Sequence, residues 1–196
     1  MVVLAACSAA SAFGINGGDL STSGLREVNF QGLRWSANNG SSLTVDDYRG
    51  LEALAIEGRR ADSYVKLEGL EFESGRIEFD LAYSGKIPPW ICLGLRSDGS
   101  ADRLRFNPTS EPGTARLSRA VLTKNERNSL VLNYRQLRQS FDANGWLHVE
   151  LAIKDGICWI TVGNDSQVTM LLENPFADGG FAIQGNCYIR NFKVES

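Results

Sequence analysis

Two acidic residues, two positions apart, could do chemistry. Glu78 and Asp80 belong to the segment GRIEFDLAYSG, residues 75–85, which has the alternating polar and apolar pattern of a β-strand. Side chains at i and i+2 of a strand point to the same face, so both carboxylates are expected on one polar face. Retaining glycosidases use two carboxyl groups about 5 to 5.5 Å apart. A solvated strand face that is only structural contains the same residue types, and this is the competing interpretation.

A candidate binding surface extends from these carboxylates to the next segments of the chain. If the strand WICLGLR, residues 90–96, lies beside the first strand, Trp90 and Arg96 share its polar face. An arginine at position 96, 103 or 105 would then pair with the two carboxylates across a concave sheet. Aromatic rings beside acidic and guanidinium groups are typical of carbohydrate sites. The predicted ligand-binding residues are Glu78, Asp80, Trp90, Arg96, Arg105 and Trp159.

Other catalytic or metal chemistry has weaker support. His148 is the only histidine, and no Gly-x-Ser-x-Gly motif supplies a nucleophile for it, so we expect it to be structural. One histidine and no Cys-x-x-Cys pair argue against zinc. The loops SDGSAD, residues 97–102, and GNDS, residues 163–166, supply oxygen ligands, although neither has the spacing of a known calcium loop. We therefore expect no metal or cofactor, and calcium is the alternative.

The elements that must position these residues are strands. About ten short segments rich in β-branched and aromatic residues are separated by Gly, Asn, Asp, Ser or Pro clusters. Helix is expected only as a short piece near residues 134–139. Many short strands predict two antiparallel sheets packed face to face. Apolar residues alternate with polar ones along these strands, and the apolar ones are expected to form the core. They include Ile77, Phe79, Leu81, Leu93, Leu95, Val149 and Leu151.

The order of the segments carries a resemblance over roughly residues 50–196. A Gly-x-Ile-Glu-Phe-Asp strand, a Gly-x-x-Arg strand, a Trp-x-His-Val strand followed by an Asp-Gly turn, and a terminal Asn-Phe-x-Val strand occur in this order. The pattern resembles the concanavalin A-like jelly-roll domains of bacterial secreted proteins, in the laminin-G-like and 3-keto-disaccharide-hydrolase-like group. The resemblance implies an all-β, two-sheet antiparallel jelly roll. One such fold hosts lectins, glucanases and adhesion modules, so it does not fix an activity.

Comparison with the laminarinase-type glucanases of this fold weighs against catalysis. Their catalytic strand has a third carboxylate, a glutamate, after the nucleophile and the assisting aspartate, whereas this strand continues from Asp80 to Ala82. We therefore expect a non-catalytic carbohydrate-binding or adhesion module. The alternative is a glycoside or modified-disaccharide hydrolase that recruits acids from elsewhere, with Asp98, Asp102 and Glu150 as candidates.

The beginning of the chain is expected to be separate from the folded domain. The sequence LAAC, ending at Cys7, matches a bacterial lipoprotein cleavage site, which predicts lipidation of Cys7 and a lipid-anchored protein of the cell envelope, periplasmic or extracellular. Residues 1–24 then form a signal remnant and linker, and residues 25–196 form the domain. Of Cys92, Cys158 and Cys187, the last two are the expected disulfide pair.

Composition limits the partners of this domain. With 43% hydrophobic residues in 196, the chain can bury a sizeable core as one domain. The formal net charge of -3, with both signs interspersed, provides no basic stripe for a nucleic acid backbone. The expected partner is a carbohydrate or glycoconjugate, and contact with a membrane is expected only through the lipid anchor.

Overall fold

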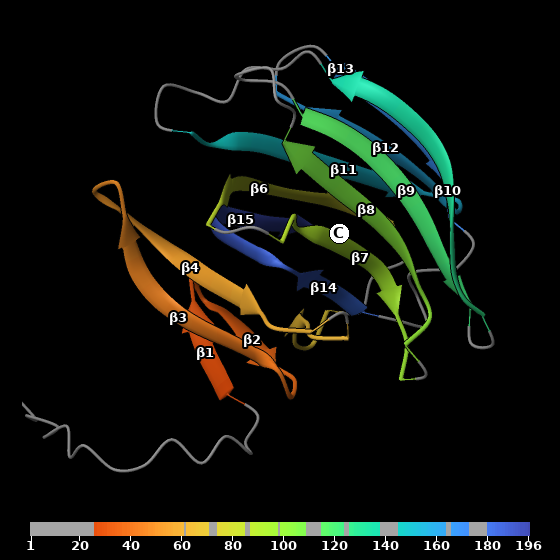
Figure 1. The fold of residues 1–196 in the computed structure, drawn as a ribbon. Helices are drawn as coiled ribbons and strands as arrows, with labels where there is room; N and C mark the ends of the chain where they lie inside the picture. Colours follow the sequence, from red (N-terminus) through yellow and green to blue (C-terminus); the bar gives the residue numbers. More distant parts are fainter. Residues whose placement is uncertain are drawn as a thin grey trace, which may run out of the picture.

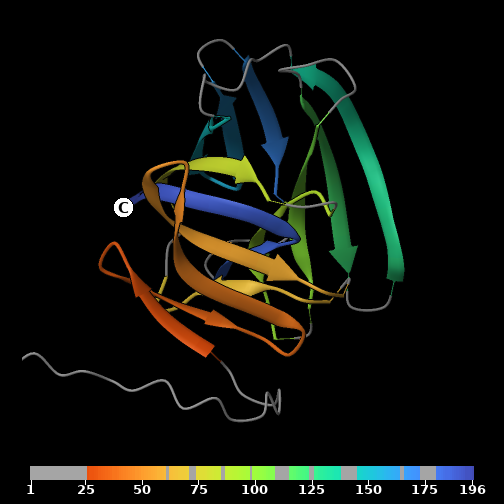
Figure 2. The same cartoon turned by 60° about the vertical axis from the view of Figure 1, so that its left-hand side comes forward.

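A computed structural model describes residues 26–60, 62–70, 74–84, 87–97, 99–108, 115–123, 126–137, 145–163, 166–172 and 180–196. All the regular secondary structure in these ranges is β-strand, and the strands form two antiparallel sheets (Figures 1 and 2). The predicted all-β, two-sheet architecture is therefore confirmed. No helix in the described ranges has the length and apolar character that crossing a membrane requires.

The first sheet has eight strands. In spatial order they are β1 (Arg26–Phe30), β2 (Leu33–Ala37), β5 (Val65–Leu67), β14 (Gly180–Gln184), β7 (Trp90–Leu95), β8 (Ala101–Pro108), β9 (Ala115–Thr123) and β10 (Glu126–Leu137). The second sheet has seven strands, in the order β13 (Ser166–Leu171), β12 (Ile157–Val162), β11 (Leu147–Lys154), β6 (Gly75–Tyr83), β15 (Asn186–Glu195), β4 (Leu51–Gly58) and β3 (Ser41–Tyr48).

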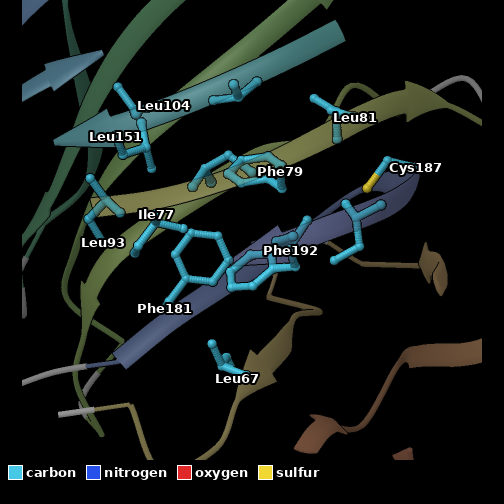
Figure 3. Packing of buried hydrophobic residues seen from close by; sticks show 14 of the residues in the cluster. Leu67, Ile77, Phe79, Leu81, Leu93, Leu104, Leu151, Phe181, Cys187 and Phe192 are labelled. Atoms are coloured by element: carbon cyan, nitrogen blue, oxygen red, sulfur yellow. The ribbon is translucent and has the colours of Figure 1, made fainter. Parts of the chain in front are cut away.

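The core lies between the two sheets because apolar side chains alternate along nearly every described strand. In Figure 3, Phe79 of β6, Phe192 of β15 and Phe181 of β14 point toward one another. The rings of Phe79 and Phe192 are stacked with centroids 5.6 Å apart, and Phe181 meets Phe192 edge-on at 5.3 Å. The predicted core residues Ile77, Phe79, Leu81, Leu93, Leu95, Val149 and Leu151 are all buried.

Two consecutive strands, β14 and β15, each lie in the interior of one of the two sheets. β14 lies between β5 and β7 in the first sheet, whereas β15 lies between β4 and β6 in the second. Figure 1 shows both strands in the middle of the molecule. Only Gly185 separates them, at a φ of +92°, where the chain crosses from one sheet to the other. A Cβ at this position would lie 2.6 Å from the carbonyl oxygen of Pro88, so the crossing requires glycine.

The structure has more strands than the sequence predicts. Strands β1, β2, β3, β9 and β13 were not expected, and the short helix predicted near residues 134–139 is wrong because Tyr134 to Leu137 belong to β10. In β2, Trp35 is fully buried and its ring meets Phe181 and Phe192 edge-on, although the polar residues around it in the sequence resemble a loop. Pairing with neighbouring strands therefore overrides the weak local signal of these segments.

Candidate functional site

The predicted common face of Glu78, Asp80, Trp90, Arg96 and Arg105 is wrong. The carboxylates are on β6 in the seven-stranded sheet, and Trp90 and Arg105 are on β7 and β8 in the eight-stranded sheet. The chain changes sheets between β6 and β7. Each group points away from the shared core, so the two groups lie on opposite outer faces of the sandwich.

On the outer face of the seven-stranded sheet, Asp80 is the centre of a polar network. Its Oδ1 lies 2.9 Å from His148 Nδ1, and its Oδ2 accepts a 2.7 Å hydrogen bond from Asn191 Nδ2. Arg190 Nε lies 3.3 Å from the same Oδ2. Cross-strand pairing explains this assembly, because Asp80 is opposite His148 on one side and Arg190 on the other.

Glu78 belongs to a second group of charges on the same face. Arg76 Nη2 lies 2.5 Å from Glu78 Oε1 and 2.9 Å from Glu150 Oε2, so one guanidinium bridges the two carboxylates. Lys193 Nζ lies 3.7 Å from Glu78 Oε2. The predicted charge ladder therefore exists, but its cations are Arg76, Arg190 and Lys193 instead of arginines 96, 103 and 105. Arg190 and Lys193 are polar residues of β15 that lie opposite Asp80 and Glu78. They can be identified as partners only once β15 is known to pair with β6.

An aromatic cluster that the sequence did not indicate borders this network. Trp146 is 3% exposed, and the guanidinium carbon of Arg190 lies 4.6 Å from its ring centroid. Tyr48 meets Trp146 edge-on at 5.3 Å and stacks on Tyr188 at 4.2 Å. These rings cover Ala53 and Ala82, so a small secondary core lies on the outside of the sheet.

Trp90 and Arg105 lie together on the outer face of the eight-stranded sheet. Trp90 pairs with Arg105 of β8 on one side and with Gln184 of β14 on the other. The guanidinium carbon of Arg105 lies 5.0 Å from the centroid of the indole ring, which is a cation–π contact. Trp90 is partly exposed, and Gln184 is 5% exposed. An amide, an indole ring and a guanidinium thus form one row across three strands.

A second row lies next to the first. Cys92 pairs with Arg103 of β8 and with Ala182 of β14. Burial raises the pKa of Cys92 to about 11, and Arg103 partly opposes this rise, so the thiol is protonated at neutral pH. Ala182 and Ala101 add small buried side chains to this row. Farther along the face, Ser36 hydrogen-bonds Glu68, which also lies 3.6 Å from Lys66 Nζ.

The remaining predicted residues are dispersed. Arg96 is in the turn after β7, where its backbone N–H donates to the carbonyl oxygen of Ser100. Trp159 is partly exposed on β12, on the outer face of the seven-stranded sheet, as its alternation with Cys158 and Ile160 predicts. Asp102 is fully buried, in the core-facing phase of β8. Arg96 and Trp159 therefore do not join Trp90 and Arg105 in one constellation.

Three cysteines of the described chain are free and buried. Cys92, Cys158 and Cys187 form no disulfide, so the predicted pairing of Cys158 with Cys187 is wrong. The last two face the core from β12 and β15, which β11 and β6 separate in the sheet. Burial raises the pKa of Cys158 to about 12, and burial also raises the pKa of Cys187.

Several predictions fall outside the described residues. Cys7, the proposed linker 1–24, Asp98 and positions 164 and 165 of the second candidate calcium loop are among them. Within the described ranges, no group of three or more His, Cys, Asp or Glu side chains is placed to hold a metal ion.

Comparison with known proteins identifies the fold. No protein-family model matches the chain, and no curated protein matches it in sequence. Among solved structures, the carbohydrate-binding module CBM66 from Bacillus subtilis is 12% identical with a TM-score of 0.52, covering 80% of this chain and 96% of that one.

Two glucanases have the same architecture. A glycoside hydrolase family 16 endo-glucanase from Bacteroides ovatus is 12% identical with a TM-score of 0.55, covering 78% of this chain and 85% of that one. The β-glucanase of Bacillus licheniformis is 12% identical with a TM-score of 0.50, covering 88% and 87%. The chain therefore has the jelly-roll sandwich fold that these binding modules and hydrolases share.

Proposed function

We propose that this protein is a non-catalytic carbohydrate-binding module whose site is the outer face of the eight-stranded sheet around Trp90 and Arg105. The observation that carries the proposal is the contact of Trp90 with Arg105, because it combines a partly exposed aromatic ring with a partly exposed guanidinium, in one row with the buried Gln184. Sugars present apolar C–H faces edged by hydroxyl groups, and such a row offers complementary surfaces to both. The fold that the chain shares with CBM66 of Bacillus subtilis is consistent with this role.

The hydrolase alternative has less support from the geometry. Glu78 and Glu150 are the carboxylates that a retaining mechanism would use, since they pair across β6 and β11. Arg76 is within contact distance of both, so a guanidinium occupies the space where a glycosidic oxygen would have to sit. On the opposite face, none of the described side chains that β14, β7 and β8 direct outward is a carboxylate.

The proposal also includes a subgroup of the fold and a location in the cell. We place the domain in the laminin-G-like and 3-keto-disaccharide-hydrolase-like group of jelly rolls, and we place the protein in the cell envelope, held there through a lipid on Cys7. The sequence patterns described above are the basis of these assignments.

A pair of tryptophan variants tests the site. Purified wild type, Trp90→Ala and Trp159→Ala are screened on a glycan array, and the affinity of each for the best ligand is then measured by calorimetry. Trp90→Ala should weaken binding at least about tenfold, as expected when an aromatic anchor is lost from a binding site. Trp159→Ala removes the same side chain from the opposite face and should leave the affinity unchanged.

The same preparations test catalysis. Glu78→Gln keeps the shape of the side chain but removes its charge, and no release of reducing sugar is expected from either this variant or the wild type. Hydrolysis of a glycoside by the wild type that disappears in Glu78→Gln would replace the binding-module proposal with the hydrolase alternative. Binding lost in Trp159→Ala but retained in Trp90→Ala would move the site to the other face.

A further inference from the structure

Two arginines follow each other on the face proposed to bind sugar. Arg103 and Arg105 are two positions apart on β8, so their Cα atoms lie roughly 6.6 to 7 Å apart on one side of the strand. The described neighbours on this side are Cys92 and Trp90 of β7, then Ala182 and Gln184 of β14. None of these neighbours carries a negative charge. Asp102 precedes Arg103 in β8, but its side chain is buried and points to the other side of the strand, toward the core.

Both guanidinium groups are only partly satisfied within the protein. The Nε atoms of Arg103 and Arg105 are buried and have no hydrogen-bond partner in the described part of the chain. Arg190 on the opposite face also has a buried Nε without a hydrogen-bond partner among the described residues, but a carboxylate balances its charge, because Asp80 Oδ2 lies 3.3 Å from that Nε. Burial lowers the pKa of Arg103 from its ordinary value, which indicates a cation that has lost part of its hydration.

A planar anion would complete this arrangement. The two Nη atoms of an arginine form a fork that matches the two oxygens of a carboxylate or a sulfate, and this end is the one a ligand can reach, because the Nε atoms are buried. A neutral sugar hydroxyl fills such a fork less well, because it accepts one hydrogen bond and brings no charge. Two forks side by side, next to the Trp90 ring, match a saccharide that carries anionic groups on its rings.

We propose that the ligand of this face is an acidic saccharide, whose carboxylate or sulfate groups are bound by Arg103 and Arg105 beside Trp90. This inference rests on the carbohydrate-binding function proposed above and names the class of glycan. A nucleic acid is disfavoured as the anion, because positive and negative residues are interspersed along the sequence and no basic stripe is available for a phosphate backbone.

Matched pairs of glycans test the charge requirement on the intact protein. Binding to polygalacturonate is compared with binding to its methyl ester, and binding to dextran sulfate with binding to dextran. The first pair tests carboxylate, and the second tests sulfate. At least one charged member should bind ten times or more tightly than its neutral partner, and this binding should weaken as sodium chloride is raised.

Arginine variants locate the effect. Arg103→Gln and Arg105→Gln should each weaken binding of the charged glycan about ten- to one-hundredfold, the range for a charge-assisted hydrogen bond. Arg59→Gln removes an exposed arginine in the turn after β4 and should bind as the wild type does. If a glutamine variant fails to fold, Arg105→Lys replaces it, since lysine keeps the charge but loses the fork.

Each remaining outcome overturns a defined claim. Equal binding of charged and neutral partners, still dependent on Trp90, would refute the acidic ligand and leave the carbohydrate-binding function intact. Binding of neutral β-glucans alone would do the same. Equally tight binding of double-stranded DNA would show an unselective polyanion surface and refute the inference. No binding to any glycan would refute the proposed function together with the inference.

Discussion

Asp80 has the largest set of polar partners in the described part of the outer network of the seven-stranded sheet. Its carboxylate contacts an imidazole, an amide and a guanidinium contributed by two flanking strands, β11 and β15. The side chain is only 13% exposed, so these contacts are partly shielded from water. A carboxylate in this position joins three strands through side chains as well as through backbone hydrogen bonds.

Asp80→Asn should therefore destabilise the fold. The variant keeps the size of the side chain but removes the charge that Arg190 and Asn191 contact, which should lower the free energy of unfolding by about 1 to 3 kcal/mol. Urea unfolding followed by tryptophan fluorescence measures the change. Asp62→Asn makes the same substitution at an exposed turn and should stay within about 0.5 kcal/mol of the wild type. Equal effects in the two variants would show that the network adds no stability.

At the scale of the element, the crossing between β14 and β15 depends on one residue. Gly185→Ala places a Cβ against the Pro88 carbonyl and also forces alanine to a φ of +92°. Gly50→Ala in the β3–β4 turn imposes a positive φ of 80° with open space around the new methyl group. The Gly50 variant should lose about 1 to 2 kcal/mol, the cost of left-handed backbone in a residue with a Cβ.

Gly185→Ala should lose more stability than Gly50→Ala, because it adds a steric clash to the same backbone cost. Thermal unfolding of the two variants in parallel checks the order. If Gly185→Ala is as stable as Gly50→Ala, the backbone at Pro88 must shift freely, and the crossing is not tightly packed.

The sequence predicts single strands better than their neighbours. The alternation in β6 assigned Ile77 and Phe79 to the core and Glu78 to an outer face, and the structure confirms this phase. The partners of Glu78 were not predictable from that alternation, because β15 joins β6 from more than 100 residues later in the sequence, as the contact from Asn191 to Asp80 shows. Alternation is a local property, whereas the assignment of a strand to a sheet is set by long-range pairing.

The same limit explains the outcome for the candidate site. Trp90 and Arg105 are in adjacent strands of one hairpin, so it could be predicted from the sequence that they lie next to each other. Gln184, which completes their row, comes from β14 and carries no sequence signal of its own. Trp35 was missed because a short strand rich in polar residues between turns resembles a loop until its partners are known.

At the scale of the whole molecule, the buried thiols predict how stability depends on pH. An unfolded cysteine ionises near its ordinary pKa of 9.0, whereas burial holds the pKa of Cys92 at about 11 and that of Cys158 at about 12. The folded state therefore retains protons that the unfolded state releases above pH 9. Its stability is complete below that pH and falls as the pH rises, by up to about 1.4 kcal/mol per pH unit for each thiol.

Thermal unfolding in reducing buffer at pH 7.5, 9 and 10 measures this decline. Cys92→Ala removes one of the titrating groups, so its stability should fall less steeply between pH 9 and 10 than that of the wild type. A melting temperature that rises over this interval would contradict the burial of the thiols.

The position of β14 and β15 also bears on how the protein is made. A ribosome releases residues 180–196 after all the other described strands, yet these residues lie inside both sheets. Until they emerge, β1, β2 and β5 have no hydrogen-bonded connection to β7 and the strands beyond it, and β3 and β4 are likewise separated from β6. The nascent chain consequently carries four unpaired strand edges where the finished sheets have continuous pairing, and such edges invite aggregation. Both sheets therefore remain incomplete until residues 180–196 have been synthesised, and until then the open edges must be shielded from other nascent chains.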